Sequence, residues 1–154
     1  MNIVVFKIMD REYGVDIPQV KEVIRSRRIT PVPDTAEFVE GVIILRGKVI
    51  PVINLRKKLG MESKILDKKS RIVIAQVGSH ILGMTVDSIS DVLRIDREKI
   101  TVPDEALHEA RYLIGLININ KRLILLVDMV KLLTGEEVAG VHKVYDRVEV
   151  RKRV

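Results

Sequence analysis

The side chains of this chain that could carry out catalytic or metal chemistry are few and far apart. Its three histidines, His80, His108 and His142, have no partner at the spacing of metal ligands. His80 falls in a predicted hairpin turn, where exposure to solvent is its simplest role. The absence of cysteine excludes a thiolate nucleophile, a disulfide framework and a cysteine-ligated metal. The sequence also lacks a glycine-rich phosphate-binding loop of the Walker or dinucleotide type.

Two carboxylates, Asp87 and Asp91, are close enough in the sequence to face each other across one turn. Paired carboxylates act in acid–base catalysis when a cleft shifts their pKa values. At these positions both are better explained as cap and turn residues. We therefore expect no catalytic residue, no metal and no cofactor. A carboxylate with a perturbed pKa in a deep cleft would instead support the hypothesis of a small hydrolase.

One charged pair has a more specific interpretation, because Arg46 stands at the edge of an apolar run. An unpaired cation is costly to bury, so Arg46 must reach solvent or find a carboxylate. Glu22 is the candidate partner. Such an ion pair would brace a structural turn, shape a binding surface, or do both, and the sequence leaves these roles open.

The elements that position Arg46 lie in residues 41–59. Two apolar runs, 42–45 and 49–53, flank the break Arg46-Gly47-Lys48. Matching aliphatic runs around a short glycine-containing break predict a β-hairpin. Both runs are nearly continuous rather than alternating, which predicts strands that are covered on both faces.

This stretch recurs later in the chain. Residues 115–133 align with residues 41–59 without a gap. Residues 83–94 align with residues 14–25, and residues 100–104 correspond to residues 29–34. Three blocks in the same order indicate an internal duplication. The chain is therefore predicted to contain two similar β-rich lobes, one at about 7–61 and the other at about 71–135.

The two copies differ at the charged pair. Asp91 takes the position of Glu22, and Asn120 takes the position of Arg46. Asparagine tolerates the left-handed conformation of a tight turn, but it supplies no cation. We therefore expect this ion pair in the first lobe only.

Composition agrees with a mainly β domain. Of the 154 residues, 47% are apolar and 3% aromatic, so Val, Ile and Leu must build the core, and they favour strands. No apolar run reaches the length of a membrane span, and the first residues do not resemble a signal peptide. We expect a cytoplasmic protein without direct membrane insertion.

Residues 136–154 form a tail outside both repeats. Their apolar spacing favours a helix with a basic end. Because the tail is not part of the duplicated pattern, we expect removal of residues 141–154 to leave the fold intact.

The net charge of +6 and the pI near 9.7 raise nucleic acid as a partner. However, the basic residues are interleaved with 21 carboxylates, and the chain has no tryptophan and few other aromatics for base stacking. A basic β-barrel that binds nucleic acid is therefore the alternative hypothesis rather than the first one.

Over most of its length, from Phe6 to about Leu133, the sequence resembles the CheW-type chemotaxis coupling proteins. The similarity is carried by Phe6, Tyr13-Gly14-Val15-Asp16-Ile17, Val20-Lys21-Glu22-Val23-Ile24, Ile29-Thr30-Pro31-Val32-Pro33, Phe38-Val39-Glu40-Gly41-Val42-Ile43, Leu45-Arg46-Gly47, Val49-Ile50-Pro51-Val52-Ile53-Asn54-Leu55 and Val86-Asp87. Two positions depart from the family pattern, since Ile44 stands where the family usually has Asn and Asn54 where it often has Asp.

This resemblance implies a mainly β fold of two intertwined, SH3-like five-stranded β-barrel lobes with a few short helices, in a CheW-like domain of residues 1–135. It implies no enzyme activity. The expected function is an adaptor, or scaffold, that couples the cytoplasmic tips of chemoreceptors to the regulatory domain of a CheA-type histidine kinase. A groove between the lobes would accept an apolar helix face of the receptor tip.

The resemblance also indicates which residues contact these partners. Carried over position by position, the expected partner-binding residues of the first lobe are Val20, Glu22, Gly41, Arg46 and Gly47. Two further residues, Gly83 and Val86, are expected on the second lobe. No nucleic acid is expected as a partner.

Overall fold

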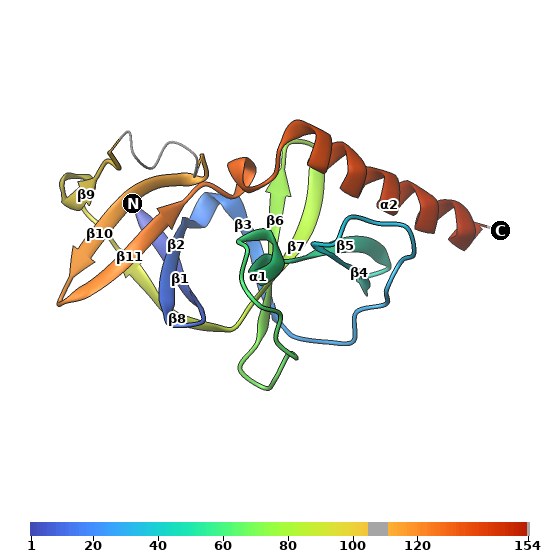
Figure 1. Cartoon of the computed structure of the whole chain (residues 1–154), viewed down its shortest axis with the longest axis horizontal. Helices are drawn as coiled ribbons and strands as arrows, with labels where there is room; N and C mark the ends of the chain where they lie inside the picture. The colour runs from blue at the N-terminus through green and yellow to red at the C-terminus, as the bar shows by residue number, and fades with distance from the viewer. Residues whose placement is uncertain (105–110, 154) are drawn as a thin grey trace.

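A computed structural model describes residues 1–104 and 111–153 and shows a mainly β fold built on two sheets (Figure 1). The strands are β1 (Asn2–Ile8), β2 (Arg11–Asp16), β3 (Val20–Arg25), β4 (Val39–Leu45), β5 (Lys48–Asn54), β6 (Arg71–Val77), β7 (His80–Val86), β8 (Ser88–Arg94), β9 (Ile100–Thr101), β10 (Leu113–Ile119) and β11 (Arg122–Val127). The helices are η1 (Ile17–Gln19), α1 (Leu55–Lys58), η2 (Arg97–Lys99), η4 (Met129–Leu132) and α2 (Gly135–Arg153).

Each sheet combines strands from both sequence repeats. The six-stranded sheet has the order β8-β1-β2-β11-β10-β9, and the five-stranded sheet has the order β3-β6-β7-β5-β4. The β1–β2 hairpin thus joins β10 and β11 through a parallel β2–β11 pairing, and β7 pairs in parallel with β5. The predicted intertwining of two β lobes is confirmed, and the two-residue β9 adds a sixth strand to one of them.

The predicted hairpins form with tight turns. Arg46 and Gly47 link β4 to β5 with φ values of 51° and 77°, and Asn120 and Lys121 link β10 to β11 with φ values of 49° and 65°. Two consecutive residues with positive φ are typical of type I′ turns, whose twist matches that of the paired strands. The asparagine in the second copy has the role that its residue type predicts.

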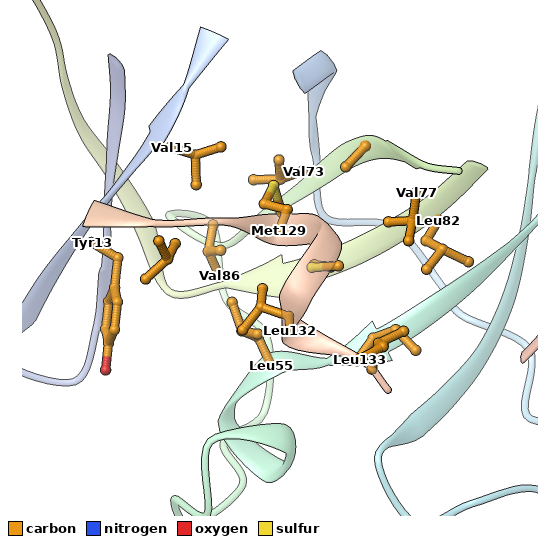
Figure 2. Packing of buried hydrophobic residues seen from close by; sticks show 14 of the residues in the cluster. Tyr13, Val15, Leu55, Val73, Val77, Leu82, Val86, Met129, Leu132 and Leu133 are labelled. Carbon is orange, nitrogen blue, oxygen red and sulfur yellow. The ribbon is translucent and has the colours of Figure 1, made fainter. Parts of the chain in front are cut away.

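A common core joins the two sheets. Figure 2 shows Tyr13 and Val15 of one sheet in the same cluster as Val73 and Val86 of the other, next to Met129 and Leu132 of η4. Burial raises the pKa of the Tyr13 hydroxyl, because its ring packs in this core. Asp128 caps η4 by accepting a hydrogen bond from Val130 N at 3.0 Å, as its position before the helix predicts.

The tail forms a helix, as predicted, but it belongs to the core. Thr134 and Glu137 exchange side-chain to backbone hydrogen bonds of 2.9 and 3.1 Å, a capping box that begins α2. From there α2 extends along the five-stranded sheet (Figure 1), and it buries Val141 and Val144 to 1% and 2% exposure. The burial of Val141 and Val144 argues against the expectation that removal of residues 141–154 leaves the fold intact, because the apolar face of the helix covers a sheet.

The helices of the described residues include none long and apolar enough to cross a membrane.

Candidate functional site

The Glu22–Arg46 ion pair, which the sequence allows, is present at the surface of the five-stranded sheet. Arg46 donates from Nη1 to Glu22 Oε2 at 2.6 Å and from Nη2 to Glu22 Oε1 at 3.1 Å. The Arg46 side chain is 71% exposed and that of Glu22 29%. The hydrogen bonds from Arg46 lower the pKa of Glu22, and the same bonds raise the pKa of Arg46. Arg46 therefore both binds a carboxylate and is exposed to solvent.

The backbone places this pair at the end of a row of cross-strand neighbours. Through successive pairings, the row runs from Glu22 to Ile74, Gly83, Val52 and Gly41. Arg46 follows in the turn after β4 and returns to Glu22, so the ion pair connects the two edge strands. Three of the residues expected to bind a partner, Glu22, Gly41 and Gly83, therefore share one row.

The two glycines of this row are required by close approach of other atoms. A Cβ on Gly41 would lie 2.1 Å from the carbonyl oxygen of Thr30, and the φ of Gly41 is +149°. A Cβ on Gly83 would lie 2.9 Å from Ile72 Cγ2. Gly41 lets the segment around Thr30 pair with β4 through the Thr30–Val42 bridge. Gly41 and Gly83 are both buried, and they permit close packing inside the lobe.

The other expected residues divide by exposure. Val20 is half-buried at the start of β3, and Gly47 is exposed in the turn beside Arg46. Val86 is 1% exposed and lies in the common core (Figure 2), so it supports the fold as Gly41 and Gly83 do. The expected residues that reach the surface are thus Val20, Glu22, Arg46 and Gly47.

The second lobe repeats the row. Asp91, Val5, Gly14, Leu126 and Gly115 are successive neighbours in the six-stranded sheet, in the same order of residue types as the first row.

A cation also binds the carboxylate at the end of this second row. Arg122 binds Asp91 Oδ2 at 2.6 Å and Glu12 through two bonds of 2.7 and 3.0 Å. The hydrogen bond from Arg122 lowers the pKa of Glu12, and both carboxylates raise that of Arg122. Asn120, at the position equivalent to Arg46, carries no charge, and Asp91 instead binds a cation that lies two positions further along the hairpin.

The candidate catalytic carboxylates do not converge. Asp87 binds the guanidinium of Arg56 and accepts a hydrogen bond from Met9 N at 2.8 Å. Burial tends to raise the pKa of Asp87, but these bonds outweigh burial and lower it. Asp91 faces Arg122 instead. Both carboxylates thus have structural partners.

The histidines are not as scattered as the sequence suggests. The rings of His80 and His142 lie 4.2 Å apart, because α2 docks against the start of β7. His80 is half-buried rather than fully exposed. Among the described residues, no group of three or more His, Cys, Asp or Glu side chains is placed to hold a metal ion. His108 lies outside the described residues.

A hollow of about 550 Å³ lies beside Arg122, where the segment that leads into β6 passes the six-stranded sheet. It is lined by Lys7, Glu12, Lys69, Arg71, Ser88, Ile89, Ser90, Asp91 and Arg122. We call this site the basic hollow. Its walls come from both sheets, as expected of a groove between the lobes, but they are charged and polar rather than aliphatic.

Comparison with known proteins agrees with this architecture. A family model described as the CheW-like domain matches residues 2–137. The chain is 36% identical to the chemotaxis protein CheW of Klebsiella aerogenes, over 91% of this chain and 86% of that protein. It is 35% identical to the CheW of Thermotoga maritima, over 83% of this chain and 84% of that protein.

A solved structure is similar as well. The scaffolding protein TtCheW from Thermoanaerobacter tengcongensis superposes with a TM-score of 0.80 at 34% identity, covering 88% of this chain and 89% of the other. The two sheets, the duplicated rows and these similarities define one class of protein: the chain belongs to the CheW-like family.

Proposed function

We propose that the protein is a chemotaxis adaptor, or scaffold, that couples the cytoplasmic tips of chemoreceptors to the regulatory domain of a CheA-type histidine kinase. The single observation that carries this proposal is the exposed Glu22–Arg46 pair on a preformed surface. Family membership and the relatives' names support it. In this role the protein works in the cytoplasm, as a binding partner and not as an enzyme.

The geometry suits binding rather than chemistry. The Glu22–Arg46 bonds fix the guanidinium of a side chain that is 71% exposed, so a partner meets it in one orientation. Val20 and Gly47 lie on the strand and the turn that carry the pair. Buried Gly41 and Gly83 hold those elements at their close approach. A rigid polar pair next to an apolar residue can direct a partner's orientation and register.

The test compares two neighbouring cations in kinase activation with reconstituted receptor, kinase and the purified protein. Arg46→Ala should reduce activation by about tenfold, because it removes an exposed and oriented group. Lys48→Ala, also exposed but without an ion pair among the described residues, should change activation by less than about twofold. Equal losses in the two variants would contradict the assignment of Arg46.

A direct binding measurement tests the adaptor role itself. Co-elution of the protein with the kinase regulatory domain and with a receptor-tip fragment should survive high salt. Absence of both complexes, together with retention on nucleic acid at low salt, would favour the alternative of a basic nucleic-acid-binding module.

A further inference from the structure

Two of the three histidines meet where α2 docks on the five-stranded sheet. The rings of His80, at the start of β7, and His142, in α2, have centroids 4.2 Å apart and an angle of 35° between their planes. Neither imidazole takes part in a hydrogen bond within residues 1–104 and 111–153. A neutral imidazole has one ring nitrogen with a free lone pair, which is a common metal ligand. Two such nitrogens on neighbouring rings are therefore available to one ion.

An open hollow of about 300 Å³ adjoins the two rings, and we call it the histidine hollow. Its walls come from α2, from β5 and from the start of β7. His80 is half-buried, and the side chain of His142 is 41% exposed. One water molecule occupies about 30 Å³ of liquid, so the histidine hollow has room for an ion with its waters. It also leaves space in which the two rings can rotate.

A carboxylate stands beside one of these rings. Asp146 lies one turn further along α2, and its Oδ2 is 3.5 Å from Nε2 of His142. A carboxylate next to one imidazole nitrogen orients the ring and makes the other nitrogen a better ligand, which is the usual support of a metal-bound histidine. The charge of Asp146 also offsets that of Lys48, the cation of the lining. The exposed Lys48 side chain can extend into solvent and leave room for a metal cation.

We propose that His80 and His142 bind a first-row divalent metal ion, such as Zn²⁺, Ni²⁺ or Cu²⁺, and that this ion fixes α2 to β7. Imidazole nitrogen suits these ions, whereas Mg²⁺ and Ca²⁺ prefer oxygen ligands. Rotation of the stacked rings within the histidine hollow directs one nitrogen of each to the ion. No third His, Cys, Asp or Glu is in place among the described residues, so water completes the coordination.

The inference goes beyond the proposed function and concerns the attachment of α2. The match to the family model ends at residue 137, so the site joins the family's domain to the segment that follows it. Near its beginning α2 is tied to the rest of the fold by the Lys58–Glu137 ion pair, and further along by buried Val141 and Val144. A metal bridge adds a cross-link between the middle of α2 and β7. It therefore stabilises the docked position of the helix.

Metal titration of the full chain, free of any affinity tag, tests the proposal. Calorimetry with Zn²⁺ and with Ni²⁺ should show one bound ion per chain, and Mg²⁺ should show none. His80→Gln and His142→Gln should each weaken binding by about tenfold or more, because each removes one of two protein ligands. The matched control, His108→Gln, removes the remaining histidine of the sequence and should bind within about twofold of the natural protein. Binding that both ligand variants retain would overturn the inference and show adventitious binding elsewhere on the surface.

Measurements on the natural protein keep the test independent of variants that fail to fold. Pulsed electron paramagnetic resonance of bound Cu²⁺ should detect two imidazole ligands, and one or none would overturn the inference. At a Zn²⁺ concentration ten times the dissociation constant, the melting temperature should rise by about 4 °C. Amide hydrogen exchange in α2 should slow under the same conditions, because the ion holds the helix on β7. A bound ion that leaves this exchange unchanged would overturn the proposed attachment of α2.

Discussion

The two sheets carry equivalent cross-strand rows, yet the charged groups at their ends differ. In the five-stranded sheet, one carboxylate binds Arg46, whose side chain is 71% exposed. In the six-stranded sheet, Glu12 and Asp91 share Arg122, whose side chain is 35% exposed. The first arrangement leaves a cation available to a partner, whereas the second uses its cation within the fold. The same backbone pattern thus ends in a well-exposed cation in one lobe and in a more enclosed, doubly paired cation in the other.

Helix α2 adds a second difference. It packs on Val42 and Val49 of the five-stranded sheet, and Val49 is 3% exposed. The equivalent residues of the other copy are Leu116 and Leu123, and Leu123 is 56% exposed. Within residues 1–104 and 111–153, one lobe therefore has an intramolecular cover that the other lacks. Together the two contrasts predict that equivalent substitutions will have unequal effects.

The largest expected effect is that of Gly41→Ala. Its new Cβ would meet the backbone oxygen of Thr30 at 2.1 Å, in a φ region that L residues avoid. We expect a loss of more than about 3 kcal/mol in the free energy of unfolding, or no folded protein. Gly115→Ala should cost about 1–2 kcal/mol, because its close contact at 2.4 Å is a side-chain methyl, Ile100 Cγ2, rather than backbone. Urea denaturation of both variants measures the difference, and equal losses would contradict it.

Truncation of α2 should have the next largest effect. Removing residues 141–154 uncovers Val42 and Val49 and deletes buried Val141 and Val144. Burying a valine contributes about 1.5 kcal/mol or more, so we expect a loss of about 3 kcal/mol. Thermal unfolding followed by circular dichroism measures it. Leu123→Ala in the uncovered lobe is the control and should leave the melting temperature nearly unchanged. An unchanged melting temperature after truncation would show that α2 adds nothing to the core.

Arg122→Ala and Arg46→Ala should separate stability from binding. Arg122→Ala leaves Glu12 and Asp91 without their common cation, and we expect a loss of roughly 1 kcal/mol, kept modest by solvent screening. Arg46→Ala should lower the melting temperature less than Arg122→Ala and weaken partner binding, because its pair is more exposed. Paired stability and binding measurements decide this. A larger stability loss for Arg46→Ala would reverse the assignment of the two lobes.

The smallest effect concerns pH. The hydrogen bond from Arg122 lowers the pKa of Glu12 from its ordinary value of 4.5, so the ionised form is favoured in the folded protein. This stabilisation is fully present above the unfolded pKa and disappears as the pH falls through the lower, folded pKa. Glu12→Gln should therefore lower the melting temperature near neutral pH by about 2 °C, and the difference should vanish in acid. Glu22→Gln should show the same trend more weakly, because its pair is more exposed. A pH-independent difference would exclude the charge as its cause.

The sequence was sufficient for the duplicated strands and the tight turns, and it named Glu22 as a candidate partner of Arg46 without deciding whether the pair forms. Each depends on a local pattern, such as matching apolar runs around a short break, or a cation that burial would leave unpaired. The resemblance to a family then indicated how the lobes intertwine. The rows themselves, which join residues of strands far apart in the sequence, appear only once the register is known.

What the sequence missed depends on three-dimensional placement. Arg122 was overlooked because alignment of the copies placed Asn120 opposite Arg46, and because its partner Glu12 is 110 residues away. Its position after the turn, equivalent to Lys48, was the available signal. The contact of His80 with His142 and the covering of Val49 both require the docking of α2, which no repeat pattern indicates.

The parallel pairing of β2 with β11 has a consequence for synthesis on the ribosome. The first hairpin leaves the exit tunnel early, but Arg122, which binds Glu12 across this pairing, is made 110 residues later. At ordinary elongation rates, on the order of 10 s pass before β11, the strand that pairs with β2, has been synthesised. In the five-stranded sheet the delay between the paired strands is shorter, because β7 follows β5 closely in the chain. The last strand of the five-stranded sheet, β7, is therefore synthesised before β9, β10 and β11 of the six-stranded sheet, so the first hairpin stays without its neighbour for longer.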